Sequence, residues 1–197
     1  MADYKQHIWD FMKSKIGNEY GVAGLMGNLY AESGLSPTNL QNTYETSLGM
    51  TDAQYTTAVD NGSYSESEFV NDSAGYGLAQ WTYYSRKQLL YNEKVSAGVS
   101  IGDIDLQLNF LYWELQNSYP TVLRTLETAT TIRQASDVVL LDFERPADQS
   151  ESVQLYRASL GQSFYNELTG TGGGGGGGGG GVTIPRKRMS KILLYEG

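Results

Sequence analysis

Ten consecutive glycines, from Gly172 to Gly181, divide the chain into two unequal parts. A glycine run has no side chains to bury and a high conformational entropy, so residues 169–181 are expected to form a flexible linker. The 16 residues that follow, 182–197, are too few to build a hydrophobic core of their own. They are interpreted either as a short basic tail or as the truncated start of a further module. A single folded domain is therefore expected in residues 1–168.

The residue types that are missing exclude several kinds of chemistry. The chain has no cysteine and one histidine, His7. Disulfides, a thiolate nucleophile and zinc sites built from cysteines or several histidines are therefore impossible. A serine triad would have to use His7, which is predicted on the polar face of the first helix, and no nucleophile elbow is present. Hydrolytic chemistry is left to carboxylates, and no metal or cofactor is expected.

The charge distribution argues against binding to a polyanion. The formal net charge is −8, and segment 182–197 carries four basic residues against Glu196, which leaves −11 for the remainder. We therefore expect no nucleic-acid partner and favour a neutral polymer held by stacking and hydrogen bonds. No window of about 18 apolar residues predicts a membrane span. The first residues lack an apolar core, so no signal peptide is expected.

Helical periodicity dominates the pattern of apolar residues, and caps and breakers give the boundaries. The predicted helices cover residues 3–16 (capped by Asp3), 18–33, 51–61, 83–97, 103–119, 121–128, 132–144 and 150–168. Residues 35–50 are predicted to be irregular, and short runs at 64–70 and 76–81 predict a small β-hairpin. The predicted fold class is α+β, mainly α-helical.

The second predicted helix carries a carboxylate in a distinctive position. It presents an apolar stripe at i, i+3, i+4 and i+7, formed by Val22, Leu25, Met26 and Leu29. Glu32 lies about 70° from the centre of that stripe, in the last turn before Gly34 ends the helix. Partial burial and the negative end of the helix dipole should both raise the pKa of Glu32, as a general acid requires. The alternative is an ordinary surface glutamate.

A second informative stretch runs from Asn71 to Trp81. Its glycines allow close approach of the backbone, while Tyr76, Gln80 and Trp81 supply rings and an amide that could contact a sugar. Tyr83 and Tyr84 follow directly and offer two more rings. The alternative is a β-turn with a buried tryptophan.

Together these stretches resemble the phage tail-tip lysozyme family, which is related to goose-type lysozymes and lytic transglycosylases. Three segments carry the resemblance: Gly-Asn-Leu-Tyr-Ala-Glu32-Ser-Gly-Leu, Asp72-Ser-Ala-Gly-Tyr-Gly-Leu-Ala-Gln-Trp-Thr and Phe143-Glu-Arg-Pro-Ala-Asp-Gln-Ser. The similarity covers about residues 5–168. It implies a lysozyme-like fold in which the small hairpin forms one wall of the cleft.

The resemblance also implies a reaction: cleavage of the β-1,4 bond between N-acetylmuramic acid and N-acetylglucosamine in peptidoglycan. Glu32 corresponds to the catalytic acid of the family. Gly75 stands where animal c-type relatives carry a second carboxylate, so Asp72 is the candidate for that role, followed by Glu68 and Glu66. All three could instead be solvated carboxylates.

Further expectations follow from the same resemblance. Ser33, Tyr76, Gln80 and Trp81 are expected to bind substrate. Glu114 and Glu144 are expected to pair with arginines such as Arg145 or Arg157 to hold helices together. The protein is expected to be a monomer that acts on the bacterial wall, either after release by the lysis machinery or within a phage tail. Two alternatives stay open, a lytic transglycosylase and a catalytically degenerate module that only binds glycan.

Overall fold

The computed structural model describes residues 4–171, and within this range the chain forms ten α-helices and one π-helix. The helices are α1 (Lys5–Ile16), α2 (Glu19–Ser33), α3 (Asn42–Leu48), α4 (Asp52–Asn61), α5 (Glu66–Asn71), α6 (Tyr84–Ala97), α7 (Ile104–Asn117), α8 (Pro120–Thr128), α9 (Ile132–Val138), the π-helix η1 (Val139–Glu144) and α10 (Glu151–Thr169). The predicted cap Asp3, most of the glycine linker and the basic segment lie outside the described residues.

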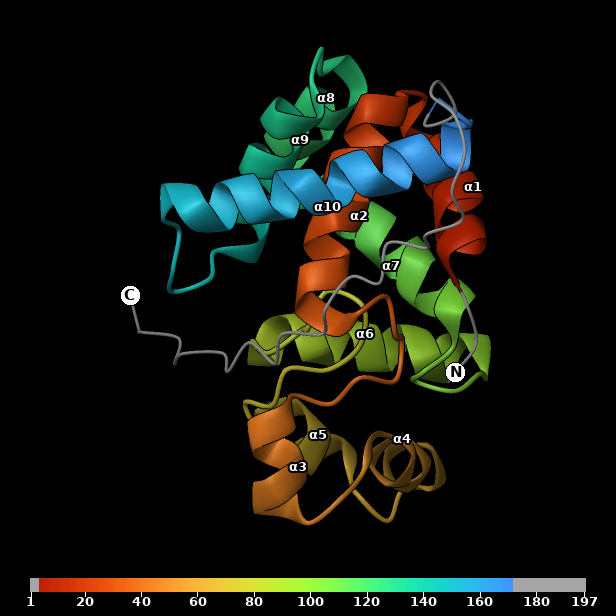
Figure 1. Ribbon diagram of the computed structural model, residues 1–197. Coiled ribbons are helices and arrows are strands. Elements are labelled where there is room, and N and C mark those ends of the chain that lie inside the picture. The colour runs from red at the N-terminus through yellow and green to blue at the C-terminus, as the bar shows by residue number, and fades with distance from the viewer. Residues whose placement is uncertain (1–3, 172–197) are drawn as a thin grey trace.

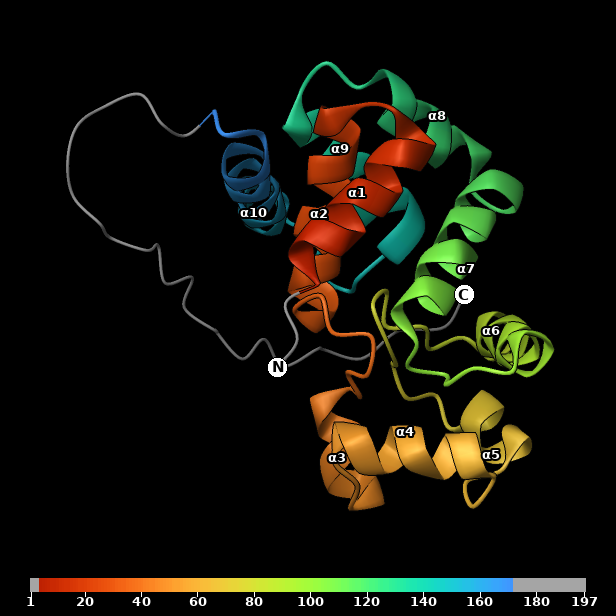
Figure 2. The same ribbon diagram turned by 90° about the vertical axis from the view of Figure 1, so that its right-hand side faces the viewer.

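The helices form a larger and a smaller group. Helix α2 lies within the larger group, among α1, α7, α8, α9 and α10, and its C-terminal end points toward the smaller group of α3, α4 and α5 (Figures 1 and 2). Helix α6 packs against both α5 and α7 and so connects the two groups. The end of α2, where Glu32 lies, is therefore next to the junction.

Helix α2 is the centre of the larger group because its glycines admit three neighbours at backbone contact. A Cβ on Gly21 would lie 2.0 Å from the carbonyl oxygen of α8 residue Leu126, and one on Gly24 would lie 2.6 Å from the Cβ of Ala135 in α9. A Cβ on Gly27 would lie 2.4 Å from a backbone oxygen of α10. Three residues turn a helix by about 300°, so each glycine faces a different side. The three glycines therefore let α8, α9 and α10 lie directly against the backbone of α2.

The boundaries of most predicted helices are also confirmed. Thr51 caps α4 with a capping box, and Asp103 caps α7 by accepting from the backbone of Leu106. The four residues of the predicted apolar stripe on α2 are fully buried. The mainly helical part of the fold-class prediction therefore holds.

The predicted β-hairpin is not found among residues 4–171. The run 64–70 was wrongly expected to be a strand: it forms α5, which opens with a capping box between Ser65 and Glu68. Residues 76–81 make a tight turn with only isolated antiparallel bridges, from Tyr76 to Trp81 and from Leu40 to Tyr76. Residues 35–50, expected to be irregular, contain α3, which buries no residue.

Candidate active site

Glu32 occupies the last turn of α2, and Gly34 ends the helix in the left-handed conformation with a φ of 64°. The side chain of Glu32 is only 2 % exposed. It is therefore not the surface glutamate that was the alternative interpretation. A carboxyl group with so little access to water needs partners within the protein.

Arg157 of α10 is one such partner. Its Nη2 donates to Oε1 of Glu32 at 2.6 Å, and its Nη1 donates to Oδ1 of Asn28 at 3.1 Å. Asn28 in turn donates to the backbone oxygen of Gly24 and to both oxygens of Ser136 on α9. The guanidinium favours the ionised form of Glu32, whereas burial and the helix terminus favour the neutral form. Sequence reasoning had considered only the second influence.

The turn at residues 75–81 is fastened to the end of α2. Oγ of Ser33 donates to the backbone oxygen of Leu78 at 2.9 Å. Gln107 of α7 accepts from the backbone N–H of Leu78 and donates to the backbone oxygens of Pro37 and Ile101. A Cβ on Gly77 would lie 2.6 Å from the Gln107 side chain, so only glycine fits there. The sequence motif therefore serves to seat this turn beside Glu32's helix.

The side chains expected to contact sugar belong instead to this packing. Tyr76 and Trp81 are fully buried. The hydroxyl of Tyr76 bonds to Thr56, and Nε1 of Trp81 donates to Glu114 at 2.7 Å. Gln80 is 5 % exposed and donates to backbone oxygens, and Ser33 is also buried. The substrate-binding roles given to these four residues are not supported, because buried rings and satisfied amides offer no surface to a polymer.

Asp72 is a buried counter-ion. Its Oδ1 accepts from Nζ of Lys87 at 2.5 Å and from the backbone N–H of Ala74 at 2.8 Å. Its Oδ2 accepts from the hydroxyls of Tyr55 and Tyr64 at 2.5 and 3.3 Å. A carboxylate has about four acceptor positions, and all four are occupied. The structure thus gives no support to the prediction that Asp72 activates a water molecule.

Lys87 explains why Asp72 is held in this way. Its ammonium group is fully buried, lies 4.3 Å from the ring centroid of Phe69 and also donates to the backbone oxygen of Ala74. Burial lowers the pKa of Lys87, while the charge of Asp72 acts in the opposite direction. The proximity of Asp72 raises the pKa of Tyr55 further, although burial is the larger cause. These groups fix the segment before the turn.

The other acidic candidates also have structural roles. Glu68 caps α5, and Glu66 accepts from Gln88 at 2.7 Å. Glu114 was expected to pair with an arginine, with Arg145 and Arg157 as examples. It does pair with an arginine, Arg86, from which it accepts two hydrogen bonds at 2.6 and 2.9 Å.

Glu144 is the last residue of η1, and one of its carboxylate oxygens is buried. His7 is exposed and lies 2.6 Å from Asp105, as expected of a surface residue.

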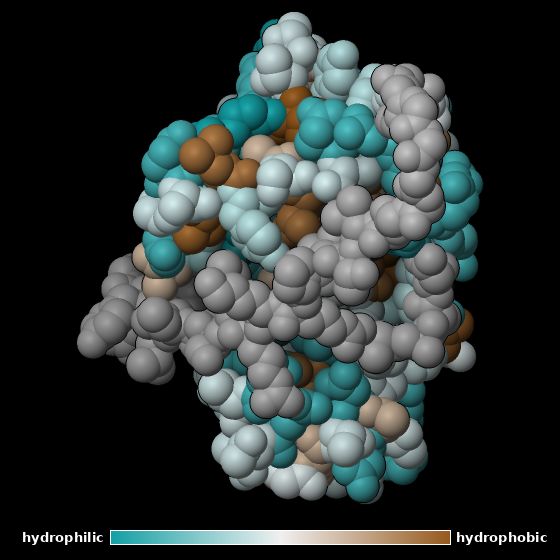
Figure 3. Space-filling view, viewed as in Figure 1, coloured by the Kyte–Doolittle hydropathy of each residue, from teal (hydrophilic) through white to brown (hydrophobic). Residues whose placement is uncertain are grey.

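Exposed rings lie just beyond the turn. Tyr83 and Tyr84 are 65 % and 59 % exposed, with ring centroids 5.1 Å apart. Hollows of about 350 Å³ on α4 and about 200 Å³ between α6 and α7 are not lined by Glu32. On the coloured part of the surface in Figure 3, apolar residues lie singly among polar ones.

Among residues 4–171, no helix is long and apolar enough to cross a bilayer, and no cluster of three or more acidic or histidine side chains could hold a metal ion.

Comparison with known proteins gives two findings. The family described as phage tail lysozyme matches residues 3–168. The chain is 25 % identical over 174 residues to Morphogenesis protein 1 of Bacillus phage B103. That alignment covers 85 % of this chain and 40 % of the phage protein, so this chain spans well under half of that relative.

Proposed function

Because the chain belongs to the phage tail lysozyme family, we propose that it cleaves the β-1,4 bond between N-acetylmuramic acid and N-acetylglucosamine in peptidoglycan, with Glu32 as general acid. A lysozyme-like, peptidoglycan-degrading role follows from the family. The choice of bond and of acid is our proposal. The observation that carries it is the buried, partnered carboxyl of Glu32 at the end of α2, next to the junction of the two helix groups.

In this mechanism Glu32 donates a proton to the glycosidic oxygen as that bond breaks. Positive charge then develops at C1 of the muramic acid ring, in an oxocarbenium-like transition state. Since the Glu32 side chain is 2 % exposed, substrate binding has to uncover one of its oxygens. Movement at the junction of the two groups would supply that opening.

Exposed rings next to the turn supply the sugar contacts of this proposal. Tyr83 and Tyr84 replace the buried Tyr76 and Trp81 in that role. The phage origin of the similar protein supports action on the bacterial wall as part of a phage particle.

The test is Glu32→Gln, which keeps the shape of the side chain and removes the transferable proton. General acid catalysis contributes about 10²–10⁴-fold, so lysis of purified peptidoglycan should fall by at least 10²-fold. Wall binding, measured by sedimentation with insoluble peptidoglycan, should be retained. Retention of more than a few per cent of the activity would mean that another group is the acid.

A lytic transglycosylase is the second candidate, and one observation favours it. That reaction needs no carboxylate to activate water, and the four acceptor positions of Asp72 are already occupied. The two reactions differ in their products, reducing muramic ends for the hydrolase and anhydro ends for the transglycosylase. A protein that binds the wall and releases no fragment would be a degenerate glycan-binding module.

A further inference from the structure

We propose that Arg157 is a positioning residue that orients the carboxyl of Glu32 and fixes which of its oxygens carries the proton. This inference rests on the proposed role of Glu32. It begins from the 2.6 Å ion pair between Nη2 of Arg157 on α10 and Oε1 of Glu32 on α2, two residues that lie 125 positions apart in the sequence.

The guanidinium contacts two successive turns of α2. Nη1 donates to Asn28 and Nη2 donates to Glu32, which are four residues apart on the same helix face. The orientation of the Asn28 amide is fixed, because its Nδ2 donates to Gly24 and to Ser136. Oδ1 is therefore left to accept from Arg157. A planar fork held at both ends has little freedom to rotate, so it sets the direction of the carboxyl group.

This contact distinguishes the two oxygens of Glu32. An arginine N–H can only donate, so Oε1 must accept from it in both protonation states. In the neutral acid the proton is consequently carried by Oε2. When Oε2 transfers that proton to the leaving glycosidic oxygen, the carboxylate that forms is stabilised by the adjacent guanidinium. Arg157 itself neither gains nor loses a proton in this step.

The backbone that carries Arg157 is fixed by close packing. The carbonyl oxygen of Arg157 would lie 2.4 Å from a Cβ on Gly27, and a Cβ on Gly161 would lie 2.6 Å from the oxygen of Ala23. Glycine at both positions lets α10 lie directly on α2. A shift of α10 would therefore be passed on to the Arg157 side chain.

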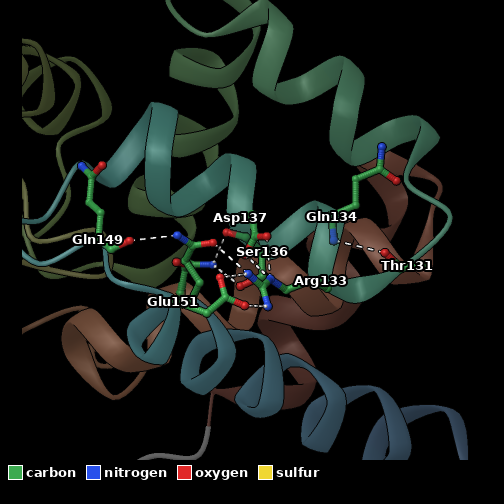
Figure 4. A network of polar contacts seen from close by, with 9 residues as sticks. Thr131, Arg133, Gln134, Ser136, Asp137, Gln149 and Glu151 are labelled. Atoms are coloured by element: carbon green, nitrogen blue, oxygen red, sulfur yellow. Dashed lines mark hydrogen bonds and ion pairs between the residues drawn. The ribbon is translucent and has the colours of Figure 1, made fainter.

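A second set of contacts holds the start of α10 on α9. Figure 4 shows the side chain of Arg133 between Asp137 of its own helix and Glu151 of α10. Arg133 donates to Glu151 at 3.0 and 2.9 Å, to Asp137 at 2.7 and 2.5 Å, and to Gln154 at 2.8 Å. Gln154 in turn donates to the backbone oxygen of Gln149. These contacts lie three to six residues before Arg157, within two helical turns, and so restrain the part of α10 that carries it.

The experiment compares Arg157→Lys and Arg157→Met with the wild-type chain on soluble peptidoglycan fragments. Misplacing a reacting group by about 1 Å can cost about 10²-fold in rate, so kcat of Arg157→Met should fall by about that factor with KM changed less than about threefold. Lysine keeps the charge but lacks the rigid planar fork with which Arg157 donates to Asn28 and Glu32 from two separate nitrogens. Arg157→Lys should therefore recover only part of kcat.

The matched control is Arg86→Met, which breaks a second arginine–glutamate pair of the described chain, the pair that Arg86 forms with the buried Glu114. It should lower Tm at least as much as Arg157→Met while keeping kcat within a few-fold of wild type. Wild-type kcat in folded Arg157→Met, or in Arg157→Lys if the methionine variant does not fold, would overturn the proposal. So would an equal loss of kcat in Arg86→Met. If wild type cleaves glycan and Glu32→Gln does not, either of these kinetic results would refute the role of Arg157 and leave the proposed function standing. If wild type cleaves no glycan, the proposed function itself is refuted.

Discussion

The contact between α2 and α10 can be perturbed by one methyl group, through Gly27→Ala. The added Cβ would lie 2.4 Å from the oxygen of Arg157 and 2.6 Å from the nitrogen of Gly161. Both are backbone atoms, so the helices must separate. Overpacking of this kind costs about 1–3 kcal/mol, and the better helix propensity of alanine returns at most about 1 kcal/mol. We expect a net loss of stability of about 1–2 kcal/mol.

Gly21→Ala is the stability-matched control, since its Cβ would lie 2.0 Å from the backbone oxygen of Leu126 on α8. At about 2–4 °C of Tm per kcal/mol, both variants should melt several degrees below wild type. Only Gly27→Ala displaces Arg157, so only it should lose about 10-fold or more in kcat on soluble fragments at a temperature where both are folded. Equal activity in the two variants would refute the positioning of Glu32 through α10. An unchanged Tm in Gly27→Ala would refute the packing itself.

Two further predictions concern stability. Asp72→Asn should lower the free energy of unfolding by about 3–5 kcal/mol, because it leaves the charge of Lys87 buried without its counter-ion. The kcat of the folded variant, measured at low temperature, should stay within a few-fold of wild type. A large loss of kcat with an unchanged Tm would restore Asp72 as a catalytic candidate. The hydrogen bonds from Arg133 lower the pKa of Glu151 in the folded protein below its usual value of 4.5. The ionised Glu151 therefore stabilises the fold fully above pH 4.5, and this stabilisation is lost as the pH falls through the lowered pKa of the folded state. The Tm difference between wild type and Glu151→Gln should accordingly be present at pH 7 and become smaller as the pH falls below 4.5, whereas a difference independent of pH would contradict the ion pair of Glu151 with Arg133.

Local patterns in the sequence account for most of the helical fold. The apolar stripe on α2 and the helix predicted over residues 51–61 each depend on residues within a few positions of one another, and each was confirmed. The missed helix α5 also had a local signal, the capping box from Ser65 to Glu68, although the short run of residues 64–70 between turn residues favoured a strand. Helix α3 buries no residue and so leaves no apolar period to detect.

The site was less predictable because its contacts join distant residues. Glu32 could be singled out from its place on the helix, but its partner Arg157 is 125 residues away. Likewise, nothing in the order of residues shows that Lys87, at a position compatible with an exposed helix face, is buried against Asp72. Aromatic rings near a glycine-rich turn suggested sugar contacts, but a buried turn also packs against aromatic rings. Composition alone does not distinguish rings that bind sugar from rings that belong to the core.

The central claim is that this domain cuts the glycan chain with Glu32. Its most direct test is mass spectrometry of the soluble products that wild type and Glu32→Gln release from purified, peptide-intact peptidoglycan. The account predicts fragments with new muramic acid ends, reducing for a hydrolase and anhydro for a transglycosylase, from wild type, and at least 10²-fold less from Glu32→Gln. Fragments with intact glycan and newly cut peptides, or equal release of muramic ends by both proteins, would contradict it.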